Sequence, residues 1–318
     1  AQATGTITND DAGPVAIYDI QGAGHVSPFA GQVVTTHGVV TAVDSNGFYL
    51  QDATGDGDNA TSDAVFVFTN TAPTVVVGNE VDVTATVQEF TPSTAGSLSI
   101  TELTSVTDVT VTNASVALPD AVLISTDGTG RAPPTEVIDD DGVTVFDAVH
   151  DGLDFWESME GMRVTIQTPR VVGNTDSFGG TYVVASDGVG ATGLNSHSGM
   201  TISPGDNNPE TVTIGRDAGV YAGFNPNLSQ GDTLGDVTGV ITYTGGQYQI
   251  TVTEAVTVTN DVTQVRETSS LVGDATHLSY ASFNVENLAS VPDSTVDARN
   301  TQEKVDAAFA AHANEIVH

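Results

Sequence analysis

Four aspartates crowd into one short polar connection of this sequence. The connection separates two apolar stretches, residues 48–50 and 65–68, and its aspartates are Asp52, Asp56, Asp58 and Asp63. Gly55 and Gly57 let the backbone fold back tightly. Carboxylates this close repel one another unless water or a shared cation screens them, and calcium prefers such oxygen ligands. The sequence therefore predicts a calcium-binding loop or a solvated acidic loop. It is not an EF-hand, because the twelfth position carries no Glu and no helices flank it.

Other residue types with catalytic or ligating potential form no recognisable constellation. The run Asp139, Asp140, Asp141 is read as a turn or as cation ligands. No two histidines have the spacing of a zinc site, so we expect them on the surface or in the core. They are His25, His37, His150, His197, His277, His312 and His318. The sequence contains no Gly-x-Ser-x-Gly motif, no Walker loop and no cysteine, which also excludes disulfides.

The few aromatic residues offer one further candidate surface. Tyr49, Phe66 and Phe68 could form the base-stacking face of a small β-barrel. No basic groove accompanies them, and strand alternation would bury at least half of them, so we favour a place in the core. The single tryptophan, Trp156, is expected in the core or at a domain junction.

Charge restricts the partners of the chain. Forty-one acidic residues face seven basic ones, which gives a net charge of −34. Tight nucleic-acid binding by counterion release is excluded, because no basic stripe neutralises phosphates. Such a surface suits salty water and the uptake of divalent ions, and indicates a marine or halophilic source. No window resembles a transmembrane helix or a signal peptide.

Val- and Thr-rich stretches punctuated by Gly, Asn and Asp predict a mainly β chain. Residues 1–13 contain a short terminal strand, and residues 14–112 form a first module that residues 17–21 open. A bent strand at 31–43 follows, then strands at 48–50 and 65–68. The stretch 75–87 reads as strand, turn and strand, and strands at 98–103 and 106–111 close the module. Five or six short strands, one of them bent, predict an OB-fold barrel.

Residues 113–265 repeat the β pattern after a proline-containing connection. A helical pattern through Phe146, Val149, Leu153 and Trp156 precedes strands at 162–167, 170–172, 182–185, 211–214, 236–243 and 248–258. A weak echo of the first module predicts a second OB-like barrel with an insertion near 173–209. Residues 266–318 read as a linker, a strand at 277–288 and a helix at 301–318. The predicted fold is thus two tandem OB-like barrels followed by an incomplete α/β unit.

Three phrases resemble the OB-fold region of large secreted bacterial nucleases of the endonuclease/exonuclease/phosphatase superfamily. They are residues 17–68, residues 155–164 (FWESMEGMRV), and a strand motif formed by Leu278, Tyr280, Ser282, Phe283, Asn284 and Asn287. The similarity spans roughly residues 15–318. It implies that Asn284 belongs to the metal- and phosphate-binding pocket of a catalytic domain. The first residues, with the phrase GTITNDD, resemble the end of a Calx-beta-type repeat.

The resemblance implies a non-catalytic accessory region of a secreted, metal-dependent nuclease. The family's metal-binding Glu and catalytic His would lie downstream of residue 318, so magnesium or another divalent ion, and nucleic acid, would be bound there. The alternative is a structural or adhesive calcium-binding module of an extracellular or cell-surface protein, self-associating by strand exchange. A third reading, a carbohydrate-binding β module, lacks an aromatic platform evident from sequence.

Overall fold

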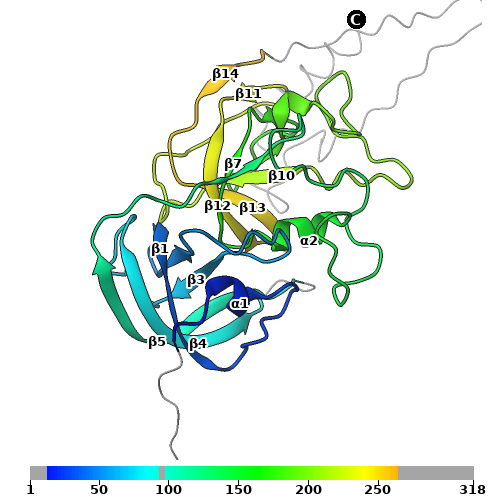
Figure 1. Ribbon diagram of the computed structural model, residues 1–318. Helices are drawn as coiled ribbons and strands as arrows, with labels where there is room; N and C mark the ends of the chain where they lie inside the picture. The colour runs from blue at the N-terminus through cyan, green and yellow to red at the C-terminus, as the bar shows by residue number, and fades with distance from the viewer. Residues whose placement is uncertain (1–12, 93–96, 264–318) are drawn as a thin grey trace, which may run out of the picture. The chain divides into compact units, whose positions relative to one another are not determined.

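The computed structural model describes residues 13–92 and 97–263. The chain is mainly β, as predicted, and up to Val262 it forms one compact unit with two sheets (Figure 1). The predictions for residues 1–12 and for the α/β unit with Asn284 lie outside the described residues. No helix of the described part is long and apolar enough to cross a membrane.

The first sheet is a closed five-stranded barrel with the order β1-β2-β3-β5-β4, the architecture expected of an OB-fold. Its strands are β1 (Val33–Asp44), β2 (Gly47–Gln51), β3 (Ala64–Phe68), β4 (Glu80–Phe90) and β5 (Ile100–Asn113). Alternate residues point into the barrel, since side chains of a strand alternate between its two faces. In β4 the inward set is Val81, Val83, Ala85 and Val87.

The long strand β1 closes the barrel because it pairs with two neighbours. Its first half pairs with β4 and its second half with β2, and Val39 pairs with both. A bulge lies between Val40 and Ala42, which confirms the predicted bend. Gly38 lies where β1 passes from its pairing with β4 to its pairing with β2. A glycine is needed there, because a Cβ would lie 2.8 Å from the carbonyl oxygen of Gln51.

Two local predictions need correction, and the structure also defines the element at residues 17–21, to which no secondary structure was assigned. Ile17–Gln21 is a short helix, α1, whose Ile17 and Ile20 are fully buried against the barrel. Residues 75–79 form a turn rather than a strand before β4. The predicted helix through Val149 is wrong: α2 spans only Gly152–Glu157, and Val149 is 75% exposed. The apolar spacing predicted a helix correctly only at its C-terminal end, where Trp156 lies in α2 and is buried as predicted.

The second sheet has nine strands and curls into a half-barrel. Its order is β14-β11-β8-β9-β10-β13-β12-β7-β6, with parallel pairs β10–β13 and β6–β7. The strands are β6 (Val122–Ile124), β7 (Arg163–Ile166), β8 (Arg170–Val171), β9 (Thr181–Val184), β10 (Val212–Gly215), β11 (Thr233–Leu234), β12 (Val237–Thr244), β13 (Gln247–Val252) and β14 (Val258–Asn260), with a 3₁₀ turn at Ser186–Gly188.

The two sheets share buried contacts. The core of the second sheet includes Ala64 from β3, and Ile100 at the start of β5 and Leu98 just before it pack against this core. Hydrogen bonds cross the junction: Ser62 Oγ donates to the carbonyl oxygen of Glu160 at 2.6 Å, and Arg163 N donates to Gln51 Oε1 at 2.9 Å. The second sheet therefore partly covers the outer face of the barrel beside β12.

Candidate binding site on the outer face of the barrel

The aromatic residues of β2 and β3 lie on the outer face of the barrel. Phe48 and Val67 point into the barrel core and are fully buried, whereas Tyr49, Phe66 and Phe68 are half-buried on the opposite face. Tyr49 and Phe66 are cross-strand partners with ring centroids 4.9 Å apart. The prediction that these three aromatics lie in the core is wrong, because the residues that alternate with them, Phe48, Leu50, Val65 and Val67, occupy the inward positions.

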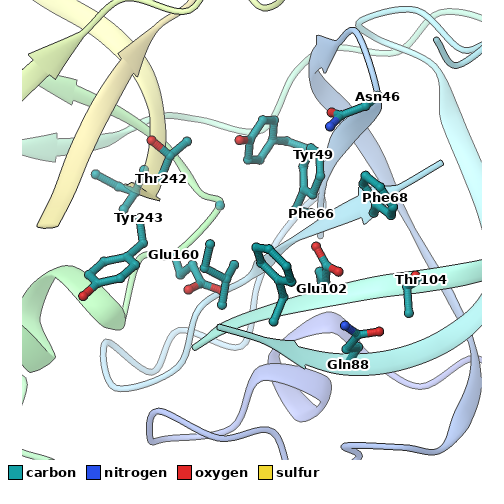
Figure 2. Close-up of a pocket in the computed structure, with 14 residues that line it drawn as sticks. Asn46, Tyr49, Phe66, Phe68, Gln88, Glu102, Thr104, Glu160, Thr242 and Tyr243 are labelled. Atoms are coloured by element: carbon teal, nitrogen blue, oxygen red, sulfur yellow. The ribbon is translucent and has the colours of Figure 1, made fainter. Parts of the chain in front are cut away.

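These rings line a cavity of about 420 Å³ (Figure 2). Its walls come from the barrel strands, from the turn that joins α2 to β7, and from β12. The lining residues are Asn46, Tyr49, Phe66, Phe68, Gln88, Phe90, Ile100, Glu102, Thr104, Glu160, Gly161, Ile241, Thr242 and Tyr243. Within the described residues the lining contains no Lys, Arg or His, so the cavity offers nothing that would neutralise an anion.

Two carboxyl groups, those of Glu102 and Glu160, line the cavity beside these aromatic rings. Glu102 projects from the outer side of β5 but is only 8% exposed, and burial raises its pKa to about 7. Its side chain forms no hydrogen bond within the described chain. Glu160 is 4% exposed; its Oε1 accepts from Thr101 N at 3.0 Å, while its Oε2 has no hydrogen-bond partner. Burial, and next the charge of Glu157, raise the pKa of Glu160 well above its ordinary range.

Sequence reasoning missed both glutamates. The available signal was local: Glu102 stands between Thr101 and Leu103 on a strand, and Glu160 lies in the apolar segment FWESMEGM. An acidic residue in an apolar segment marks either an outward position or a buried polar group. Only the packing of the second sheet distinguishes the two.

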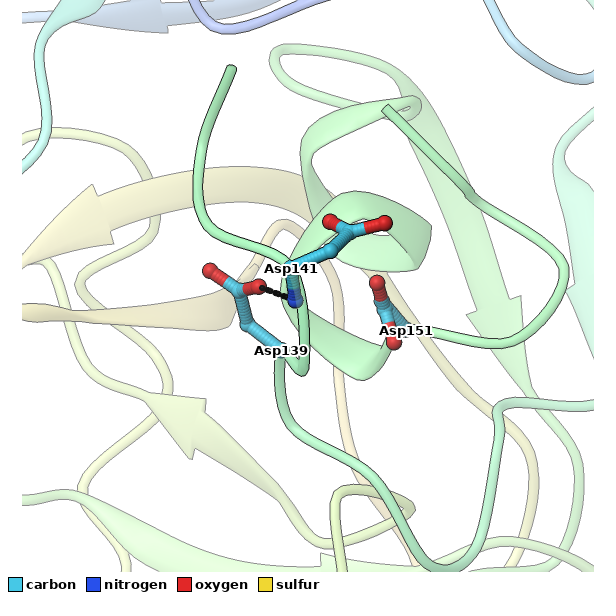
Figure 3. Close-up of side chains that lie close together, drawn as sticks. All are labelled: Asp139, Asp141 and Asp151. Atoms are coloured by element: carbon cyan, nitrogen blue, oxygen red, sulfur yellow. Dashed lines mark hydrogen bonds between the residues drawn. The ribbon is translucent and has the colours of Figure 1, made fainter. Parts of the chain in front are cut away.

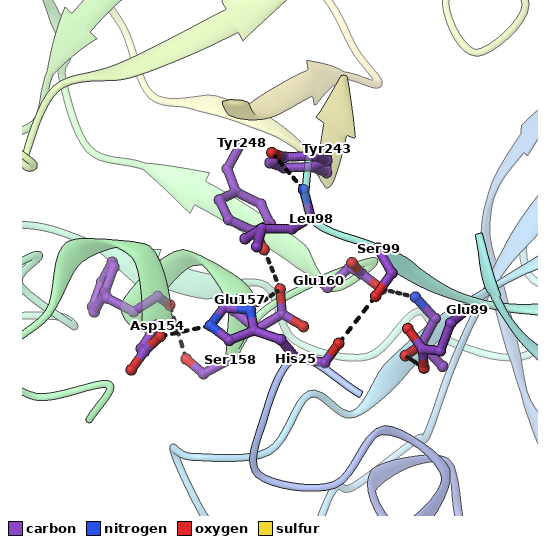
Figure 4. Close-up of polar contacts among 12 residues, drawn as sticks. His25, Glu89, Leu98, Ser99, Asp154, Glu157, Ser158, Glu160, Tyr243 and Tyr248 are labelled. Carbon is purple, nitrogen blue, oxygen red and sulfur yellow. Dashed lines mark hydrogen bonds and ion pairs between the residues drawn. The ribbon is translucent and has the colours of Figure 1, made fainter. Parts of the chain in front are cut away.

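A buried network next to the cavity surrounds His25 (Figure 4). His25 Nε2 lies 2.7 Å from Asp154 Oδ1, and its Nδ1 lies 3.3 Å from Glu157 Oε2. Tyr248 donates its hydroxyl hydrogen to Glu157. Burial lowers the pKa of His25, but hydrogen bonds and charge from Glu157 and Asp154 outweigh it, so the pKa is raised. His25, in the loop between α1 and β1, is only 6% exposed. Its contacts with Asp154 and Glu157 therefore hold this loop against α2 and have a structural role.

In the predicted calcium loop, the aspartate side chains accept hydrogen bonds from backbone amides of the same loop. Asp52 Oδ1 accepts from Thr54 N and Gly55 N, Asp56 Oδ1 accepts from Asp58 N, and Asp58 Oδ1 accepts from Ala60 N. Its carboxylates thus cap turns of their own backbone. Asp63 is half-buried, and burial raises its pKa to about 6. In the described residues, the four aspartates do not form a group whose ligand atoms converge.

A convergent acidic group lies elsewhere, at Asp139, Asp141 and Asp151 (Figure 3). One carboxylate oxygen of each lies within 4.8 Å of the others. Asp151 directly precedes α2 and is 2% exposed; burial, then the charges of the neighbouring aspartates, raise its pKa. The sequence indicated the run at 139–141 as a turn or as cation ligands, but it did not indicate Asp151. Asp151 lies ten residues further along the chain, and only the fold brings it next to the run.

Comparison with known proteins concerns the second sheet. Residues 123–262 match a family model described as a domain of unknown function (DUF8508), which covers less than half of the chain. The match lies within the predicted second module. A search of curated proteins finds no match.

Proposed function

We propose that this chain is a non-catalytic accessory region of a secreted, metal-dependent nuclease. The observation that supports the proposal most is the closed barrel of β1 to β5, formed by the residues whose sequence resembles the OB-fold region of such nucleases. In this proposal the barrel and the second sheet support and position a catalytic domain. Phosphodiester hydrolysis is carried out by residues outside this sequence.

The properties of the described residues favour an accessory role over a catalytic one. Metal-assisted hydrolysis needs a metal, a base for water and donors for the developing charge. The acidic group at Asp139, Asp141 and Asp151 has no Lys or Arg among its members, and the cavity has none in its lining. A phosphodiester would be repelled from both. The net charge of −34 keeps nucleic acid away from this region and leaves substrate binding to the catalytic domain.

A cleavage assay tests the proposal. The gene is read beyond the codon of His318, and this chain and the longer product are each incubated with plasmid DNA in magnesium and in EDTA. We expect no cleavage by this chain, and magnesium-dependent cleavage by the longer product that the substitution Asn284→Ala reduces. A longer product that leaves DNA intact under both conditions would overturn the proposal.

A structural or adhesive calcium-binding module of an extracellular or cell-surface protein is the second candidate. The convergence of Asp139, Asp141 and Asp151 favours it, because calcium is held by carboxylate oxygens. In this case the chain self-associates. Sedimentation velocity in calcium and in EDTA distinguishes the candidates: a calcium-dependent oligomer supports this one, and a monomer in both conditions contradicts it.

A further inference from the structure

The cavity on the outer face of the barrel has the size of a small-molecule site. Its volume of about 420 Å³ lies within the range of known ligand pockets, which is roughly 300–1,000 Å³. Elements distant in sequence build its walls, since Tyr49 and Phe66 come from the barrel and Tyr243 from β12. Neither a supporting role for the barrel nor a calcium site uses this cavity.

Aromatic rings form much of the wall. Five of the fourteen lining residues carry one, and they are Tyr49, Phe66, Phe68, Phe90 and Tyr243. Figure 2 shows Tyr49, Phe66 and Phe68 on one side of the group of lining residues and Tyr243 on the other. Faces of aromatic rings attract sugars, bases and cations, so the rings alone do not select a ligand.

The two carboxyl groups in the lining restrict the class of ligand that the cavity can bind. Glu102 and Glu160 are each more than nine-tenths buried. Glu160 Oε2 is buried without a hydrogen-bond partner, and burial alone raises the pKa of Glu102. Asn46 Oδ1 is likewise buried without a hydrogen-bond partner. Buried polar groups without partners are costly, and an orphaned carboxyl is costlier than an amide. The cavity therefore contains unmatched acceptors and lacks a cationic donor.

Three ligand classes can be weighed against this lining. A phosphate or nucleotide would face two carboxyl groups with no basic side chain among the lining residues. A neutral sugar would stack on the rings but would leave the carboxyl groups without a counter-charge. An organic cation matches both features, because ring faces and carboxylates each attract positive charge.

We propose that the cavity binds a small organic ammonium ion, with Tyr49, Phe66 and the neighbouring rings around its cationic head, Glu102 as its anionic partner and the carboxyl group of Glu160 as a second acceptor. Asn46, Gln88, Thr104 and Thr242 supply amide and hydroxyl groups for polar substituents of the ligand. The proposal is independent of the nuclease role. The binding test uses this chain alone, so its failure is distinguishable from a failure of the cleavage assay.

Binding of a cation favours the ionised carboxylates, so affinity rises with pH. Glu102 has a pKa of about 7, hence the strengthening occurs between about pH 6 and pH 8. The titratable groups that face this pair are Tyr49 and Tyr243 in the wall, Glu157 and Glu89 beside Glu160, and Asp44 and Asp217 beside Tyr49. None of these carries positive charge. The nearby basic residues are His25, which lies 3.3 Å from Glu157, and Arg216, which lines a neighbouring cavity, and neither lines this one.

Calorimetric titration with choline chloride tests the proposal, with 3,3-dimethylbutan-1-ol as the neutral probe of matched shape. Cellobiose and thymidine monophosphate represent the sugar and nucleotide classes. We expect choline to bind at millimolar concentrations, at least about tenfold more tightly than its neutral isostere. Choline affinity is expected to be higher at pH 8 than at pH 6.

Two substitutions locate the site. Glu102→Gln removes one charge without changing shape, and Phe66→Leu removes a ring from the outer face while keeping apolar bulk. Each is expected to weaken choline binding by about tenfold or more, whereas the exposed control Glu254→Gln leaves it unchanged. Equal binding of choline and its isostere, tighter binding of cellobiose or the nucleotide, or no choline binding at all would each overturn the proposal.

Discussion

Replacement of Glu102 by Gln tests how the buried carboxyl affects stability. Burial raises the pKa of Glu102 from its ordinary value of 4.5 to about 7. A carboxyl whose pKa is raised in the folded state binds its proton more tightly there than in the unfolded chain. Its contribution to stability is therefore fully present at low pH and is lost as pH rises from about 4.5 through about 7.

The magnitude follows from the two pKa values. At about 1.36 kcal/mol per pH unit, ionising Glu102 in the fold costs at most about 3.4 kcal/mol. Solvent that enters the cavity screens this charge, and we take somewhat less than half of that value, about 1.5 kcal/mol, at pH 8. At pH 5 most of the folded protein carries the protonated acid, and the cost is about 0.4 kcal/mol. Gln is neutral at both pH values and has the same shape.

Thermal unfolding of Glu102→Gln and the parent chain at pH 5 and pH 8 measures the difference. At pH 8 the substitution is expected to raise the melting temperature by about 3–6 °C, since about 1 kcal/mol corresponds to about 2–4 °C in a unit of this size. At pH 5 the gain falls to about 1 °C. The exposed Glu254→Gln serves as control. An equal gain at both pH values, or a loss at pH 8, would refute the assignment of Glu102 as a buried, unpaired acid.

Three further predictions concern other parts of the unit. Phe48→Ala opens a cavity in the barrel core, where Phe48 is fully buried, and is expected to cost about 3–5 kcal/mol in urea unfolding; a cost below about 1 kcal/mol would contradict the core assignment. His25→Gln should destabilise the fold more at pH 6 than at pH 9, because the raised pKa of His25 gives stability that is lost as pH rises through it; equal losses would show that its charge contributes nothing. Asp151→Asn should raise the melting temperature in EDTA by relieving repulsion and should abolish any calcium-induced rise, while Asp52→Asn should change neither; a calcium-induced rise lost only in Asp52→Asn would instead support the acidic loop.

The acidic loop at residues 52–63 shows how much structure the spacing of residues in the sequence can predict. Its glycines adopt positive φ, 63° at Gly55 and 77° at Gly57, as a tightly folded connection requires. Yet the carboxylates bond to neighbouring backbone amides, and the acidic group with convergent ligand atoms is completed by Asp151. Proximity in sequence predicted proximity in space but not the direction of the side chains.

The sequence by itself determined the β character of the chain, the strands of the barrel and the bend in β1. Those features follow from alternation and from glycine, which act within a few residues. The tertiary structure alone decided that Tyr49 and Phe66 face outward into a cavity and that Glu102 and Glu160, far apart along the chain, lie in its wall. It also decided that α2 is a short helix of six residues. These outcomes depend on which face of the barrel the second sheet covers, and burial by a distant segment leaves no local periodic signal.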